Sequence, residues 1–303
     1  MIKETPFDVI VIGGSYSGLS AAMALGRAAR KVLIMDSGSP CNKQTPYSHN
    51  FLTQDGKPPA EIAAFARQQV RAYPTITFYE GIAASGAPGG SGFEIVAGSG
   101  ERFTAAKLLF ATGIKDLMPA ISGFAECWGI SILHCPYCHG YEVRNEKTAV
   151  LGNGEYAFDF SKLISNWTND LTLLTNGPSG LTAGQLAKIK ACGVDLLEQE
   201  VSVIEESNGQ VERVVFKDGS AISLRAIYTR LPFVQQTDIP ASLGCEITAD
   251  GYIKVDAFQR TTIPGVFACG DNSASFRALS TAVAAGSMAG AMVNKEIIEE
   301  EFG

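Results

Sequence analysis

Residues 8–36 of this chain are DVIVIGGSYSGLSAAMALGRAARKVLIMD, and they decide its fold. An apolar run is followed at once by Gly-Gly-Ser-Tyr-Ser-Gly at 13–18, then by a helix-like stretch and a second apolar run that ends at Asp36. This order predicts a strand–turn–helix–strand unit that binds a dinucleotide. The glycines allow the tight turn, although Ser15 replaces the usual middle glycine. The helix N-terminus offers N–H groups to a pyrophosphate, and Asp36 is placed to accept hydrogen bonds from a ribose.

A second copy of this plan begins at residue 147. A predicted strand leads into Gly-x-Gly-x-x-Ala, formed by Gly152, Gly154 and Ala157, and a helix and another strand follow. Thr175 stands where the first unit has its acid, and no Arg or Lys that could hold a 2′-phosphate occurs in residues 171–186. We therefore expect a second nucleotide site that is weak for nicotinamide nucleotides or has lost them.

Further strands and a long helix complete the pattern. A predicted strand over residues 107–113 ends in Ala-Thr-Gly, and another over 261–271 ends in Gly-Asp. A helix of small residues is expected over 276–298, with residues 299–301 as a solvated tail. The sequence predicts an α/β protein of two Rossmann-like domains, the second inserted in the first. The first domain is expected at residues 1–114 and 230–303, and the second at residues 115–229.

The composition excludes several classes of protein. Lys and Arg total 24 against 31 Asp and Glu, so the net charge of −7 argues against a nucleic-acid partner. No apolar run reaches the roughly 20 residues that span a bilayer. Residues 1–8 show no signal-peptide pattern, so we expect a cytoplasmic protein without structural disulfides.

The sharpest local motif is His-Cys-Pro-Tyr-Cys-His at residues 134–139. A zinc site would need more ligands, and the other five cysteines form no second Cys-x-x-Cys pair, so we predict no metal. Covalent haem attachment fits poorly with a cytosolic nucleotide fold, and two buried cysteines at chance spacing remain an alternative. The favoured interpretation is a redox dithiol, because two thiols at this spacing can close a short disulfide.

With these motifs in this order, the chain resembles the low-molecular-weight thioredoxin reductases over almost its full length. These are two-domain flavoproteins of the pyridine nucleotide–disulfide oxidoreductase class. The motifs that carry the resemblance are the turn at 13–18, Ala111-Thr112-Gly113, Cys135 with Cys138, the turn at 152–157, and Pro-Gly-Val-Phe-Ala-Cys-Gly-Asp at 264–271.

The resemblance implies FAD in the first domain, with Asp36 on the adenosine ribose and Asp271 on the ribityl chain. It implies that Cys138 faces the flavin, that Cys135 exchanges with the partner, and that the inserted domain rotates to bring dithiol or nicotinamide to the flavin. It also suggests a homodimer. The residues expected at the cofactor are Gly13, Gly14, Ser15, Ser17, Gly18, Asp36, Ala111, Thr112, Gly113, Gly270, Asp271 and Ala278.

Two departures from the family bear on the reaction. The reductases have an acidic proton donor after the second cysteine, whereas this chain has His139, which can exchange a proton near neutral pH. The motif Cys-Pro-Tyr-Cys-His-Gly also resembles that of flavin dithiol oxidases, which close disulfides in natural products with oxygen. The basic cluster of the NADPH-using enzymes is missing. NADPH, NADH, a reduced ferredoxin and the substrate dithiol itself all remain open as electron donors.

The leading hypothesis is an FAD-dependent thiol–disulfide oxidoreductase that uses Cys135, Cys138 and His139 on a thioredoxin-like protein or a small-molecule disulfide. One alternative is an oxygen-dependent dithiol oxidase, and another is a non-catalytic flavin-binding redox sensor. His49 falls in a loop that passes close to the flavin in this family, and we expect it to be a solvated loop histidine. His134 either supports the dithiol or is satisfied by the backbone.

Overall fold

The computed structural model describes residues 6–90 and 92–303, which divide into two compact units. Residues 1–5 and residue 91 lie outside the described residues. The predicted start of the first domain and most of the segment used for the signal-peptide prediction fall in residues 1–5. The first unit holds the residues up to Lys43 together with Phe51–Lys115 and Phe233–Gly303. The second holds Gln44–Asn50 and Asp116–Pro232, so a short segment that we expected in the first domain packs with the second unit.

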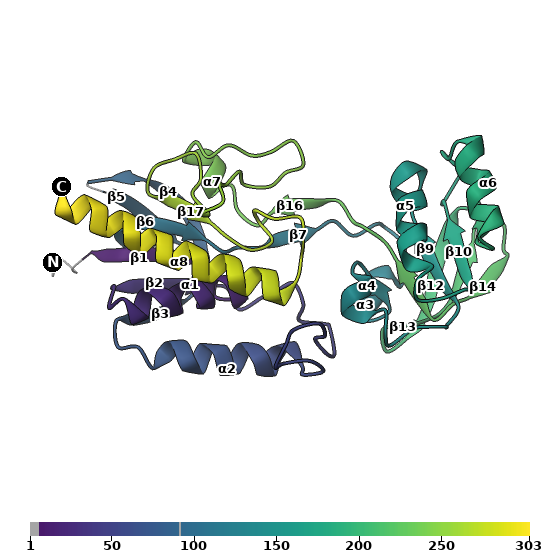
Figure 1. Ribbon diagram of the computed structural model, residues 1–303, viewed down its shortest axis with the longest axis horizontal. Coiled ribbons are helices and arrows are strands. Elements are labelled where there is room, and N and C mark those ends of the chain that lie inside the picture. Colours follow the sequence, from purple (N-terminus) through teal and green to yellow (C-terminus); the bar gives the residue numbers. More distant parts are fainter. Residues whose placement is uncertain (1–5, 91) are drawn as a thin grey trace. The chain divides into compact units, whose positions relative to one another are not determined.

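The first unit is built on a sheet of strand order β3-β2-β1-β6-β5-β4, with β17 also paired to β6 (Figure 1). Strands β1, β2, β3, β6 and β17 pair in parallel, whereas β4 and β5 form an antiparallel meander that returns to β6. The strands are β1 (Phe7–Ile12), β2 (Val32–Asp36), β3 (Ile76–Glu80), β4 (Ala83–Gly89), β5 (Gly92–Ala97), β6 (Arg102–Phe110) and β17 (Val266–Ala268).

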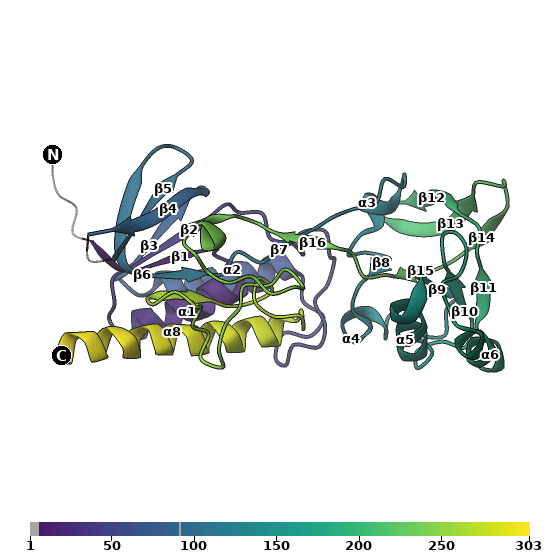
Figure 2. The same ribbon diagram turned by 90° about the horizontal axis from the view of Figure 1, so that it is seen from above.

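Helices cover one face of this sheet. Helices α1 (Tyr16–Arg27) and α8 (Leu279–Phe302) lie side by side against it, and α2 (Pro59–Arg71) packs beside α1 (Figures 1 and 2). Their apolar side chains form one core with alternate residues of β1 and β2. The other residues of the same strands form a second core with β5 and the short helix α7 (Ile239–Ser242). Both faces of β1 are therefore buried, as its unbroken apolar sequence predicts.

The second unit has three layers. Its central parallel sheet has the order β11-β10-β9-β15-β8, and the antiparallel sheet β12-β13-β14 packs on one face with α3, while α5 and α6 cover the other. Its strands are β8 (Ile132–Leu133), β9 (Thr148–Leu151), β10 (Leu171–Leu174), β11 (Asp195–Leu197), β12 (Val201–Ser207), β13 (Gln210–Phe216), β14 (Ala221–Ser223) and β15 (Ala226–Tyr228). Its helices are α3 (Phe124–Cys127), α4 (Pro136–His139), α5 (Gly154–Ile164) and α6 (Ala183–Ala191).

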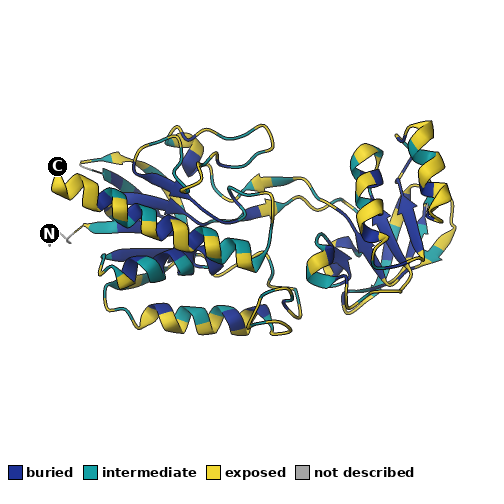
Figure 3. Ribbon diagram, viewed as in Figure 1, coloured by how far each residue is buried: buried dark blue, intermediate teal, exposed yellow. Residues whose placement is uncertain are grey.

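Between the parts of the chain that form the two units, β7 (Ile114–Asp116) and β16 (Phe233–Gln235) pair as a two-stranded sheet. In both units the central strands are buried and the helices keep exposed outer faces (Figure 3). The prediction of an α/β protein with two Rossmann-like domains, one inserted in the other, is confirmed.

The C-terminal helix is longer than predicted. We expected it to end at residue 298 with a solvated tail, but α8 continues to Phe302. Glu300 forms an ion pair with Lys107 of β6 at 2.5 Å, and Glu301 forms one with Arg30 at 2.7 Å. The expectation of a tail was wrong because these carboxylates have cationic partners that lie far away in the sequence.

Candidate active site

The first predicted turn lies at the carboxyl end of β1, where the chain enters α1. Gly13 has a φ of 106°, and a Cβ there would collide with the carbonyl oxygen of Ala111. Gly18 packs equally closely against the carbonyl oxygen of Gly13. Ser15 is the N-cap of α1, and its side chain makes no capping hydrogen bond within the described chain. The first N–H groups of α1 can therefore bind an anionic group such as a pyrophosphate.

Two donors hold Asp36 at the end of β2. The backbone N–H of Gly14 donates to Oδ1 at 3.1 Å, and Nη2 of Arg67 in α2 donates to Oδ2 at 2.6 Å. An ionised carboxylate accepts about four hydrogen bonds, so both oxygens can still accept others. The side chain is 17% exposed and can thus be reached by a ligand. Sequence reasoning missed Arg67, because no local pattern connects it with Asp36.

The Ala-Thr-Gly and Gly-Asp segments meet at this same edge of the sheet because β17 pairs in parallel with β6. Gly270 has a φ of 87°, and a Cβ there would lie 2.6 Å from Oγ of Ser17 in the first turn of α1. A Cβ on Gly113 would meet no described atom within 4 Å. The segments predicted to bind the cofactor therefore surround one edge of the first sheet, and Ala278 lies just before α8.

Asn272 joins these segments and was not predicted. This fully buried side chain donates from Nδ2 to the carbonyl oxygen of Phe110 at 2.9 Å and to Oγ1 of Thr112 at 3.3 Å. The neighbouring carboxylate of Asp271 accepts from Nε of Arg277 at 3.4 Å. Asn272 therefore fixes the turn that follows β6 relative to the segment that carries Asp271.

The dithiol lies at the start of α4 in the second unit. Cys135 and Cys138 are joined in a disulfide, with their Cα atoms 5.3 Å apart. Cys135 is the N-cap of this short helix, and its Sγ accepts a hydrogen bond from the backbone N–H of Cys138 at 3.2 Å. Pro136 at the first helical position favours this local geometry, because its fixed φ suits a helix start.

A pair of histidines lies beside the dithiol. His139 ends α4, and its ring centroid is 6.4 Å from that of His49, which the segment 44–50 brings to the second unit. Nε2 of His49 lies 3.6 Å from Oε1 of Glu142. Burial lowers the pKa of His139, the neighbouring His49 lowers it further, and Glu142 opposes the shift. His139 is therefore predominantly neutral near pH 7 and can accept a proton.

His49 differs from the expectation of a solvated loop residue, because its side chain is only 21% exposed and contacts both His139 and Glu142. Nothing in the local sequence indicates this contact. Glu142 follows His139 by three positions and could have been found by its proximity to the motif. His134 instead has its ring 6.0 Å from that of Trp128.

The second predicted turn is hydrogen-bonded to the loop that follows β10. Oδ1 of Asn153 accepts hydrogen bonds from the N–H of Gly154 at 2.8 Å and of Gly180 at 2.7 Å. Its Nδ2 donates to the carbonyl oxygen of Pro178 at 2.9 Å. Asn153 thus binds the loop of residues 176–180 to the start of α5, and its Oδ1 takes up the first N–H of that helix. Gly152 and Ala157 lie in the same turn, and Ala157 is fully buried.

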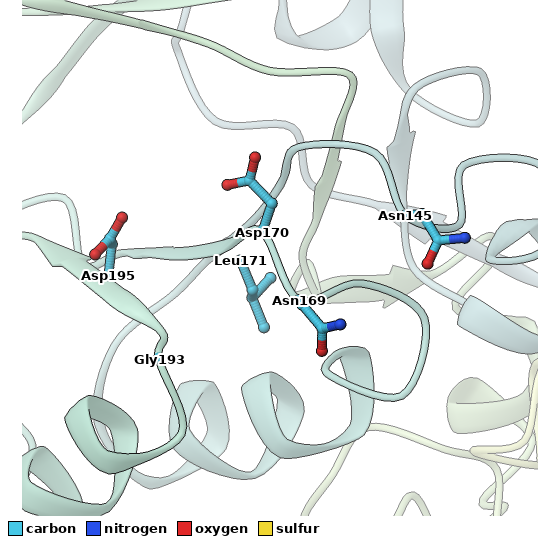
Figure 4. Close-up of a pocket in the computed structure, with 6 residues that line it drawn as sticks. All are labelled: Asn145, Asn169, Asp170, Leu171, Gly193 and Asp195. Atoms are coloured by element: carbon cyan, nitrogen blue, oxygen red, sulfur yellow. The ribbon is translucent and has the colours of Figure 1, made fainter.

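The second unit also has a hollow of about 380 Å³ (Figure 4). It lies at the amino ends of β10 and β11, opposite the edge that carries the second glycine turn, and it contains none of the predicted site residues. Its lining residues are Asn145, Asn169, Asp170, Leu171, Gly193 and Asp195. Nowhere among residues 6–90 and 92–303 do three or more His, Cys, Asp or Glu side chains gather as a metal site would require.

Two dinucleotide-binding folds, one with an open glycine turn and the other with a Cys-x-x-Cys pair, define the class of two-domain disulfide oxidoreductases. A family model described as pyridine nucleotide-disulphide oxidoreductase matches residues 7–289. The chain is 34% identical to a thioredoxin reductase, tcpT, from Claviceps purpurea, over 98% of this chain and 96% of that one. It is 30% identical to a thioredoxin reductase, aclD, from Aspergillus oryzae, over 97% and 98% of the two chains.

Among solved structures, an oxidoreductase from Agrobacterium tumefaciens superimposes with a TM-score of 0.90 at 38% identity, over 97% of this chain and 99% of that one. The chain belongs to the pyridine nucleotide-disulphide oxidoreductase family and is an oxidoreductase of the thioredoxin reductase-like class. The resemblance that the sequence motifs predicted is therefore confirmed. None of the described helices combines the length and apolar character needed to cross a membrane.

FAD is the cofactor of this family, and the residues of the first unit fit it. The uncapped N-terminus of α1 suits the pyrophosphate, and the partly exposed carboxylate of Asp36 suits a ribose. Gly270, which approaches Ser17 closely, and Gly113, which borders open space, have no side chains. The edge of the sheet is therefore free of protruding side chains at these two positions.

Proposed function

We propose that this enzyme passes two electrons between FAD and a disulfide outside the chain through the Cys135–Cys138 pair, with His139 as acid and base. The observation that carries the proposal is the bonded cysteine pair beside a predominantly neutral imidazole, in a chain of thioredoxin reductase type. The names of the curated relatives support a thioredoxin-like protein disulfide as one class of substrate. A homodimer and a cytoplasmic location stay predictions.

The chain's own residues account for the exchange steps. In the reduced pair, the N–H of Cys138 stabilises negative charge on Sγ of Cys135, which favours Cys135 as the attacking thiolate. This thiolate attacks one sulfur of the external disulfide, forms a mixed disulfide and releases the first thiol. His139 then takes the proton of Cys138, whose thiolate attacks Cys135, re-forms the internal disulfide and releases the second thiol. Bound in its reduced form, FAD would supply the two electrons that reduce the pair again, after an external donor had reduced the flavin.

The first prediction tests the role of the pair. Wild-type protein should purify with FAD and, after anaerobic reduction, should convert a small disulfide into two thiols. Cys138→Ser should keep its FAD but lose turnover by about 100-fold or more, because the mixed disulfide cannot be resolved. Thiol release and flavin absorbance measure the two properties.

Cys192→Ser is the matched control, because Cys192 is an exposed free cysteine at the end of α6. It should retain the wild-type rate. Wild-type protein without flavin, or Cys138→Ser protein with wild-type turnover, would contradict the proposal. Wild-type protein that binds FAD but shows no turnover would leave the non-catalytic sensor as the better interpretation.

One observation favours a second candidate, an oxygen-dependent dithiol oxidase. Oδ1 of Asn153 takes up the N–H of Gly154 at the start of α5 and binds the loop of residues 176–180, and Thr175 buries its Oγ1 in a hydrogen bond to the carbonyl oxygen of Gly177. Both features oppose a nicotinamide nucleotide as the electron donor. In this direction an external dithiol becomes a disulfide, and its two electrons and two protons finally convert oxygen to hydrogen peroxide.

An anaerobic titration with NADPH, NADH and a small dithiol separates the two directions. The oxidase predicts that about two dithiols per flavin bleach the flavin absorbance, since the Cys135–Cys138 disulfide and the flavin each accept two electrons, whereas equal amounts of either nucleotide do not. Admission of oxygen should then release one peroxide for each disulfide formed. Bleaching by the same amount of NADPH would exclude this candidate and support the reductase direction.

A further inference from the structure

Arg67 lies beside the acid at which the proposed function places the adenosine ribose. It is in the last half of α2, and its Nη2 donates to Oδ2 of Asp36 at 2.6 Å. The Arg67 side chain is 24% exposed and that of Asp36 is 17% exposed, so the pair is partly shielded from water but open to a ligand. Partial burial makes such an ion pair stronger than an exposed one.

Phe78 of β3 supports the guanidinium. The Cζ atom of Arg67 lies 4.9 Å from the centroid of the Phe78 ring, which suits a cation–π contact. Arg71, one turn further along α2, places its Cζ 5.1 Å from the same centroid. Among the described residues, however, the donors to the carboxylate of Asp36 are Arg67 and the N–H of Gly14. The two arginines thus share a helix and an aromatic ring but differ in their contact with the carboxylate.

We propose that Arg67 is a positioning residue for the adenosine half of FAD. Its hydrogen bond and that of Gly14 occupy one lone pair on each oxygen of Asp36, which orients the plane of the carboxylate and leaves the other lone pairs for two ribose hydroxyls. Its positive charge also offsets the repulsion between Asp36 and the FAD pyrophosphate, which the N-terminus of α1 would hold close by. This inference rests on the proposed position of the ribose.

FAD affinity of the flavin-free protein tests the proposal without using turnover. The quenching of FAD fluorescence on binding should give a dissociation constant about tenfold weaker for Arg67→Met, as expected for loss of a charge-assisted hydrogen bond. Arg71→Met, which removes the same side chain from the same ring, should stay within about twofold of wild type. Arg67→Lys keeps the charge without the planar fork and should bind FAD with intermediate affinity.

A double-mutant cycle with Asp36→Asn distinguishes positioning from general loosening of the unit. If Arg67 acts through Asp36, the double variant should bind FAD about as weakly as the weaker single variant. The inference would be overturned if the losses of FAD affinity in the two single variants multiplied in the double variant, or if Arg67→Met and Arg71→Met bound FAD equally well. In either case, flavin-dependent turnover of the wild type would still uphold the proposed function. A wild-type chain that does not bind FAD would overturn both. Thermal unfolding of each flavin-free variant confirms that it is folded.

Discussion

At the scale of single residues, the proposed chemistry depends on the protonation of one imidazole, that of His139. Burial and the nearby His49 lower the pKa of His139 below its ordinary value of 6.5, and Glu142 acts in the opposite direction. A lowered pKa favours the neutral ring, so His139 is able to accept a proton over the whole neutral range, as its proposed role requires.

A pH profile can therefore reveal the influence of His49. The rate that depends on neutral His139 should fall only below pH 6.5, as the ring takes up a proton. His49→Gln removes a like charge, so the pKa of His139 should rise and the acidic limb of kcat/KM should move to higher pH. Stopped-flow thiol exchange from acidic to neutral pH measures this limb.

His134→Gln is the control, because His134 lies against Trp128 and is not among the groups that shift the pKa of His139. Its acidic limb should stay at the wild-type position. An unmoved limb in His49→Gln would show that the two imidazoles are not electrostatically coupled. A limb that moved to lower pH would mean that His49 stabilises the protonated form.

At the scale of elements, the contact between α1 and α8 shapes the cofactor side of the first unit. A Cβ on Gly286 would collide with the backbone carbonyl of Ser17, and one on Gly290 would collide with that of Ala21. These glycines lie one turn apart inside a helix, where each costs about 1 kcal/mol relative to alanine. Their place in α8 is explained by this close approach, which holds the first turn of α1.

Gly286→Ala should destabilise the protein although alanine is the better helix former. The gain in helix propensity is about 1 kcal/mol. Against it stands an overlap with a backbone atom, whose relief by helix displacement costs typically 1–3 kcal/mol or more. We expect a lower urea midpoint and weaker FAD retention, because Ser17 belongs to the glycine turn. Ser287→Ala, on the exposed side of α8, should stay within about 0.5 kcal/mol of wild type.

Equal urea midpoints for the two variants would mean that α1 and α8 separate at little cost in free energy.

The C-terminal turns of α8 are held differently, by charges rather than by close packing. Lys107 is only 4% exposed and contacts both Glu296 and Glu300. These ion pairs explain why the helix continues through a run of glutamates that looks like a solvated tail.

At the scale of the whole molecule, one folding plan occurs twice with different outcomes. In the first unit the glycine turn is open and is followed by an acid, Asp36, at the next strand end. In the second unit Thr175 takes the corresponding place, and Asn153 forms hydrogen bonds with Thr175 and with Gly180 in the loop that follows it. The duplication therefore supplies one fold suited to a dinucleotide and another that supports the dithiol.

Much of this architecture could be predicted because its determinants are local. A buried strand, a glycine turn and an amphipathic helix follow one another directly in both units, and the spacing of Cys135 and Cys138 already allows the short disulfide that the structure contains. The acid at position 36 and its absence at position 175 are equally visible. Family-specific motifs in a defined order then predicted the class of enzyme.

The sequence by itself therefore determined the two Rossmann-like folds, the oxidoreductase class and the place of the dithiol along the chain. Only the tertiary structure decided that His49 meets His139, that Arg67 meets Asp36, and that Gly180 is hydrogen-bonded to Asn153 of the second glycine turn. Each of these contacts joins segments that are distant in the chain. They depend on how strands pair and helices pack, and no local pattern of residues encodes them.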